Sequence, residues 1–174
     1  MSSPTLLSQI SEFIDEKVAK TIRLQKPSED DEIDSYELTN PAVFEGWVPP
    51  TGFIPDGVRI PALVVGLGSG VELRGDPKTT EEVVITVIVY SPGTHKIVDG
   101  KLQYTPDFKG YIDLMNVIDR IRLELRRISN IGGYELSEKV EWKVSDEPAY
   151  PYWYGHVKFN LEKPLKNILE INLD

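Results

Sequence analysis

The sequence contains no cysteine among its 174 residues, which excludes disulfide bonds and thiolate metal sites. Histidine is nearly absent as well, because only His95 and His156 occur, and neither has a second histidine at metal-binding spacing. No apolar run approaches the roughly 18 residues that a membrane-spanning helix requires. We therefore expect no metal site, no cofactor and no contact with a membrane.

Basic side chains are also in short supply, with 19 lysines and arginines against 28 acidic residues and a formal net charge of −9. This balance argues against sequence-independent binding of nucleic acid, which relies on neutralising phosphates. The acidic run at residues 28–37 contains no glycine and so does not fit a calcium-binding loop. We interpret it as a solvated loop, with a cation site or a site for a basic partner as the alternative.

The N-terminal segment lacks the basic stretch and the long apolar stretch of a secretory signal, so an intracellular origin is the simple expectation. Apolar residues then recur at helical spacing in two segments, one of about 17 residues near the N-terminus and one over residues 107–129. In the second segment the apolar stripe steps by four and three residues. Its members are Leu114, Ile118, Ile121, Leu125 and Ile128.

Between the two helices, residues 26–61 form a long segment rich in proline, which predicts an irregular loop. Strands are predicted from residue 62, over 81–90, over 134–144 and over 152–162. Residues 95–104 predict a β-hairpin, because short arms flank Asp99-Gly100, the pair that a type I′ turn prefers. Residues 164–174 form an apolar C-terminal tail.

These elements predict one domain over residues 1–174. Its fold class is α+β, with an antiparallel or mixed sheet of about four strands, two main helices packed on one face and the hairpin as an excursion. The strand at 81–90 carries apolar residues on both of its rows, which is typical of a strand covered on both faces. One helix layer covers only one face, so we expect something else to cover the other.

No motif for catalysis is complete. GLGSG at residues 66–70 lacks the third glycine and the following helix of a dinucleotide site, so it predicts a break or bulge in a strand. Ser69 lacks the flanking glycines of a nucleophile elbow. The carboxylates Asp113, Asp119 and Glu124 share the long helix with several arginines, and we interpret them as members of ion pairs. The sequence therefore predicts a protein that is not an enzyme.

A nucleic-acid module is disfavoured too, because the arginines of residues 120–127 have no aromatic residues among them and the tyrosines of residues 150–154 lie beside Asp146 and Glu147. A local patch facing DNA in an assembled particle is the alternative. The remaining class is an assembly or interaction protein that forms a homo-oligomer. The predicted interface with a subunit or partner consists of Tyr150, Tyr152, Tyr154, Val83, Ile85, Val87, Leu169 and Ile171.

Three features together resemble the tail terminator, or tail-completion, proteins of tailed bacteriophages and phage-like tail particles. They are GYIDLMNVIDRIRLELRRI (110–128), the alternating strand after it, and YPYWYGHVKFNLEKP (150–164). The resemblance covers roughly residues 58–164 and rests on packing patterns. It implies an α+β subunit that forms a ring, usually a hexamer, at the head-proximal end of the tail tube. Such a ring stops tube polymerisation and joins the tail to the head.

The resemblance also implies the partners, which are further copies of the chain, the tail-tube protein and a head-completion or neck protein. DNA would at most pass through the lumen, and the protein would reside in the virion after assembly in the host cytoplasm. The alternatives are another phage neck or head–tail connector component, or a monomeric protein-binding module. The family pattern assigns no catalytic residue, so none is transferred to this chain.

Overall fold

The structure is a computed structural model that describes residues 3–27, 36–49, 59–72 and 78–164. It is 49% strand. The described residues contain two α-helices, α1 (Ser3–Lys17) and α2 (Lys109–Leu125), and a short 3₁₀ helix, η1 (Ala19–Thr21). Both α-helices lie in the segments where the apolar periodicity predicts them.

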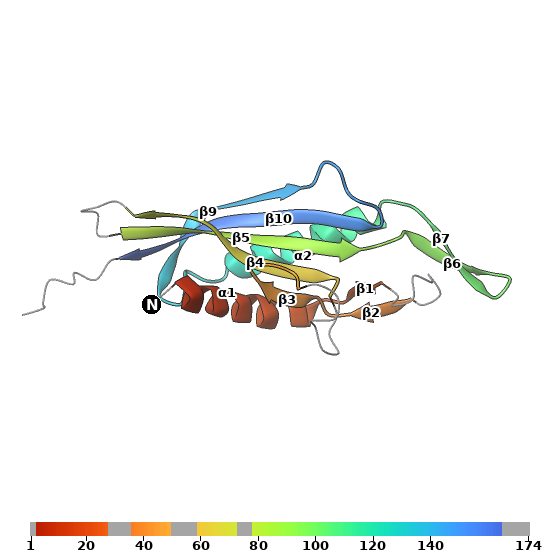
Figure 1. Ribbon diagram of the computed structural model, residues 1–174, viewed down its shortest axis with the longest axis horizontal. Coiled ribbons are helices and arrows are strands. Elements are labelled where there is room, and N and C mark those ends of the chain that lie inside the picture. The colour runs from red at the N-terminus through yellow and green to blue at the C-terminus, as the bar shows by residue number, and fades with distance from the viewer. Residues whose placement is uncertain (1–2, 28–35, 50–58, 73–77, 165–174) are drawn as a thin grey trace, which may run out of the picture.

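The main sheet has six strands and curls across its width (Figure 1). In spatial order the strands are β3 (Ala42–Glu45), β4 (Ala62–Glu72), β5 (Lys78–Tyr90), β10 (Tyr152–Pro164), β9 (Tyr134–Val144) and β8 (Asn130–Ile131). β3 and β4 run parallel and every other neighbouring pair is antiparallel. The two central strands, β5 and β10, pair along all 13 residues of each.

The prediction of a four-stranded sheet with two helices laid on one face is therefore wrong. β3 lies inside the segment predicted as an irregular loop, and β8 occupies two residues beyond the long helix. Both strands are too short to carry an alternation signal, and each is defined by its pairing with a longer neighbour. The helix α1 contacts β3, β4 and β8, so it lies near both edges of the curled sheet.

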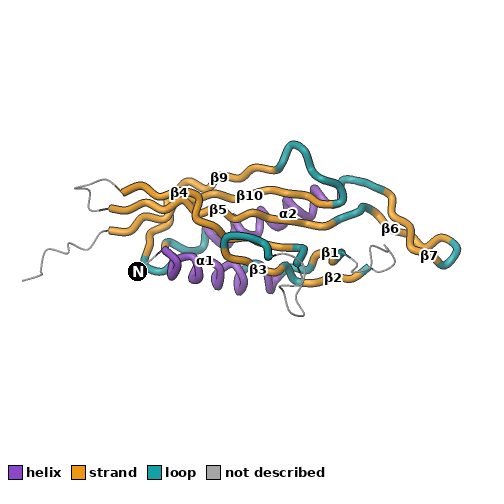
Figure 2. Tube along the Cα trace, in the orientation of Figure 1, coloured by secondary structure: helices purple, strands orange, loops and turns teal. Residues whose placement is uncertain are grey.

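A single core cluster joins the sheet to both α-helices. Leu6, Ile10 and Ile14 of α1 are fully buried, as are Leu114 and Ile118 of α2. α2 lies behind β5 and β10 in the view of Figure 2 and contacts both of these strands. The core therefore lies inside the curl of the sheet.

Two further strand pairs lie outside the main sheet. β1 (Leu24–Lys26) pairs with β2 (Glu37–Thr39), and β6 (Thr94–Val98) pairs with β7 (Lys101–Thr105). The second pair is the predicted hairpin, with Asp99 at φ 51° and Gly100 at φ 74° in its turn. The glycine-rich stretch at residues 66–70 lies within β4, where the pairing with β5 shifts register between Leu67 and Ser69, so the predicted bulge is confirmed.

Candidate interaction surface

The two apolar rows of β5 have different surroundings. Val83, Ile85 and Val87 have no exposed surface and belong to the core cluster with the helices. They lie inside the folded chain, so they cannot meet a neighbouring subunit, and their place in the predicted interface is a mistake. The alternate row, Val84, Thr86 and Ile88, is half-buried on the opposite side of the sheet. We call that side the open face.

The predicted tyrosines lie toward one end of the open face. Tyr152 pairs in register with Tyr90, and Tyr154 pairs with Ile88. The rings of Tyr90 and Tyr152 are 5.6 Å apart between centroids. Burial raises the pKa of the Tyr90 phenol, and the nearby tyrosines raise it further, so this hydroxyl stays neutral at physiological pH. The tyrosines thus add apolar rings with neutral polar tips to the surface.

Tyr150 precedes β10 and is 56% exposed. Its hydroxyl donates a hydrogen bond to the carbonyl of Pro92 at 3.0 Å, which fixes the ring near the start of the hairpin. Trp153, which the alternation assigns to the core, does pack against the core cluster. The two other predicted interface residues, Leu169 and Ile171, lie outside the described residues.

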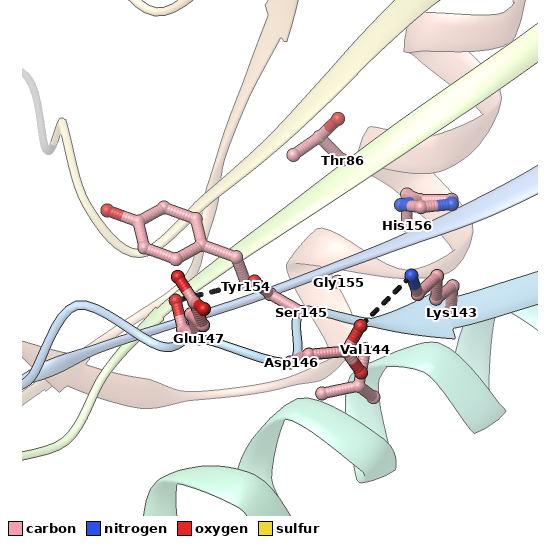
Figure 3. Close-up of a pocket in the computed structure, with 9 residues that line it drawn as sticks. All are labelled: Thr86, Lys143, Val144, Ser145, Asp146, Glu147, Tyr154, Gly155 and His156. Carbon is pink, nitrogen blue, oxygen red and sulfur yellow. Dashed lines mark hydrogen bonds and ion pairs between the residues drawn. The ribbon is translucent and has the colours of Figure 1, made fainter.

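A pocket of about 430 Å³ opens on the same face, between β5, β10 and the end of β9 (Figure 3). Figure 3 shows Tyr154 and Glu147 on one side of it and His156 and Lys143 on the other. The lining residues are Thr86, Lys143, Val144, Ser145, Asp146, Glu147, Tyr154, Gly155 and His156.

The floor of this pocket is main chain at Gly155. A Cβ atom at this glycine would lie 3.0 Å from Cδ1 of Ile118 in α2, so the residue faces the helices and leaves no side chain on the pocket side. The Ser145 amide donates to the Tyr154 carbonyl at 2.9 Å, which holds the chain after β9 against β10. The pocket is therefore a hollow in the sheet surface, walled by the Tyr154 and His156 rings.

The charges around the pocket are unevenly neutralised. Lys143 Nζ lies 3.1 Å from Asp146 Oδ2, although both side chains are well exposed. Glu147 forms no salt bridge with any residue that the structure describes. Partial burial lowers the pKa of His156, and Lys158 and Lys143 lower it further, so the imidazole is neutral at pH 7. The rim thus has an excess of negative charge.

The remaining candidate groups do not gather around this pocket. On α2, Asp119 pairs with Arg122 at 2.7 Å, and the buried Glu124 pairs with Arg120 and Arg127. These carboxylates are ion-pair members, as the sequence predicts. Burial raises the pKa of Asp113, whose carboxyl is half-buried. Within the described ranges no three His, Asp or Glu side chains are placed to hold a metal ion.

Sequence reasoning does not find a second cluster, at the base of the hairpin. Tyr36 stacks on His95 with ring centroids 4.3 Å apart, and Lys109 Nζ lies 5.2 Å from the centre of the Tyr36 ring. Gln25 Nε2 donates to the Tyr104 hydroxyl at 2.8 Å. These residues come from separate parts of the chain, and no local pattern links them.

No protein-family model matches the chain, and no curated protein matches it in sequence. Among the helices of the described residues, none has the length and apolar character needed to cross a membrane.

Proposed function

We propose that this chain is a structural subunit of a phage-type tail, forming a ring that caps the tail tube and joins the tail to the head. The proposal begins from the resemblance over residues 58–164. The observation that carries it is the open face, where Val84, Ile88 and the tyrosines present apolar side chains with no helix over them. Surfaces of this kind are typical of protein–protein contact sites.

The mechanism is complementary binding without turnover. The ring, a hexamer by the resemblance, adds to the last layer of the tube and leaves no surface on which another tube subunit can add. A head-completion or neck protein binds the other side of the ring. The net charge of −9 suits a conduit that DNA crosses without being held, because like charges repel the phosphate backbone. The protein is then part of the virion, at the head-proximal end of the tail.

Light scattering of the purified chain, alone and with tail-tube protein, tests this function. We expect a multimer several times the 19.7 kDa monomer mass, and tubes that stop growing when the chain is added. Tyr154→Ala removes a ring from the open face and should weaken capping. Tyr111→Ala removes a 42% exposed tyrosine from α2 on the helix side and serves as the matched control.

A chain that stays monomeric at every concentration and leaves tube growth unchanged would contradict the proposal. If such a monomer bound one other protein with unit stoichiometry, it would instead be a binding module. Equal loss of capping in both tyrosine variants would mean that the open face is not the contact surface.

A further inference from the structure

The hairpin formed by β6 and β7, residues 94–105, is called the arm here. It forms a two-stranded sheet of its own and extends past the end of the main sheet (Figure 1). No residue of the arm belongs to the core cluster. An isolated two-stranded hairpin is marginally stable in water, so an arm of this kind gains from a surface that covers it.

The two halves of the arm differ in what they contact. Cross-strand pairing places His95 opposite Tyr104 and Ile97 opposite Leu102, so all four side chains share one face. The half near the body is anchored, since Tyr36 stacks on His95 and Gln25 bonds Tyr104. In the outer half, Ile97 is 75% exposed. The tip is therefore an apolar knob.

Two lysines accompany this knob. Lys96 precedes Ile97 in β6, Lys101 precedes Leu102 in β7, and both are exposed. The turn carries one acid, Asp99, so the outer half of the arm is net positive. The chain as a whole is strongly acidic, so a basic projection is suited to contact another acidic surface.

The pocket on the open face has the complementary shape and charge. It is hollow, its floor is main chain, and its walls are the Tyr154 and His156 rings. Its rim carries Asp146, with a side chain 83% exposed, and Glu147. A neutral imidazole and a phenol ring form an apolar wall for an aliphatic side chain, and the carboxylates are positioned to meet lysines at its edge.

The arm of one chain does not occupy its own pocket. In Figure 1 the arm points away from the body, and the described residues show no hydrogen bond or ion pair between arm and pocket. The knob and the hollow are different patches of one surface. A contact between two such patches on successive copies is heterologous, and it closes into a ring when the rotation between copies permits.

We infer that the arm of one copy docks in the open-face pocket of the next, with Ile97 against the Tyr154 and His156 rings and Lys96 and Lys101 facing Asp146 and Glu147. This inference rests on the proposed function, because it names the contact that would close the ring.

Cysteine pairs provide the first test, because the chain has no cysteine of its own. In Ile97→Cys with Ser145→Cys, mild oxidation should join copies into a ladder of dimers and larger oligomers on a non-reducing gel. Ile97→Cys with Glu12→Cys places the second thiol on an exposed position of α1 and is the control. We expect its cross-linking to be at least about tenfold slower, which is the effect of about 1.4 kcal/mol.

A mixing experiment tests whether the contact joins two different patches. Ile97→Glu alters only the arm, and Glu147→Lys with Asp146→Lys alters only the pocket rim. Each variant alone should associate at least about tenfold more weakly than the parent chain. Mixed together they should form a one-to-one dimer, because one intact arm still meets one intact pocket. Gln103→Glu adds a charge to the polar face of the same arm and should leave association unchanged.

Far-UV circular dichroism confirms that each variant is folded, which is expected because the altered side chains are exposed. If the parent forms multimers that Ile97→Glu does not weaken, or if no ladder forms, the inference is wrong and the proposed function stands. A ladder from a chain that does not cap tubes supports the inference and contradicts the proposed function. Cross-linking of position 97 to tube protein alone overturns the inference, and a parent that is monomeric even with tube protein overturns both.

Discussion

Gly110 lies at the start of α2 and faces the indole ring of Trp153 in β10. A Cβ atom at this position would be 2.0 Å from Trp153 Nε1, far inside contact distance. The indole is held in place, since it packs against the core and its Nε1 donates to the Ser91 carbonyl at 3.3 Å. The glycine is therefore present because the helix and the strand approach too closely for any side chain.

This contact reverses the usual effect of replacing glycine in a helix. Alanine normally stabilises a helix by about 1 kcal/mol relative to glycine. We expect Gly110→Ala to lower the free energy of unfolding by about 1–3 kcal/mol instead, because the indole must shift. Urea denaturation measures this change, and Asn116→Ala, at an exposed position of the same helix, is the control. Equal or greater stability in Gly110→Ala would show that the indole moves freely.

His156 gives the fold a dependence on pH. Burial and two lysines lower its pKa in the folded chain below the ordinary value of 6.5. As the pH falls through 6.5 the unfolded chain takes up this proton first, so the folded state loses stability until the pH passes below the folded pKa. We expect His156→Gln to lose less stability than the parent between pH 7.5 and pH 5.

Urea midpoints at the two pH values measure this difference. The imidazole resonance of His156, identified by its absence from the His156→Gln spectrum, should titrate below pH 6.5. A midpoint at or above this value would contradict the electrostatic description of the pocket wall.

At the scale of elements, the sequence predicts best what is encoded within a few residues. The Asp99-Gly100 turn and the apolar stripe of α2 carry local signals, and both elements form where those signals lie. β3 and β8 carry none, because strands of four and two residues depend on partners elsewhere in the chain. For the same reason the number of strands and the curl of the sheet could not be predicted.

The candidate interface shows the same division. The alternation in β10 correctly separates Trp153 from Tyr152 and Tyr154, because one row is apolar and the other is polar. In β5 both rows are apolar, so the sequence cannot tell whether the row of Val83 or the row of Val84 meets the helices. The pocket depends on the loop after β9, which brings Asp146 and Glu147 beside β10, and no sequence pattern predicts that placement.

The arm is expected to be dispensable for folding. Its residues are absent from the core cluster, and its two ends meet closely, since a Cβ atom at Gly93 would lie 2.1 Å from the Thr105 carbonyl oxygen. Replacing residues 94–105 with two glycines should change the free energy of unfolding by no more than about 1 kcal/mol, because only contacts such as Gln25–Tyr104 are lost. Urea denaturation checks this, and a chain that fails to fold would show that the arm belongs to the core.

At the scale of the whole molecule, stability and assembly are carried by different parts. The core lies inside the curl of the sheet and uses α1, α2 and the inner rows of β5 and β10. The open face, its pocket and the arm contribute little to that core. Substitutions on them are therefore expected to change association while leaving the fold intact, which is why the proposed contacts can be tested one side chain at a time.

The pairing of β5 with β10 also determines when the sheet can be completed. β5 has β4 and β10 as its neighbours, and β10 is formed by residues 152–164, so the arm, α2, β8 and β9 all intervene in the sequence. During synthesis, β5 leaves the ribosome long before its second neighbour exists, and one of its long edges stays unpaired throughout that interval. The strand at the centre of the finished sheet is thus an edge strand for most of the time that the chain takes to be made.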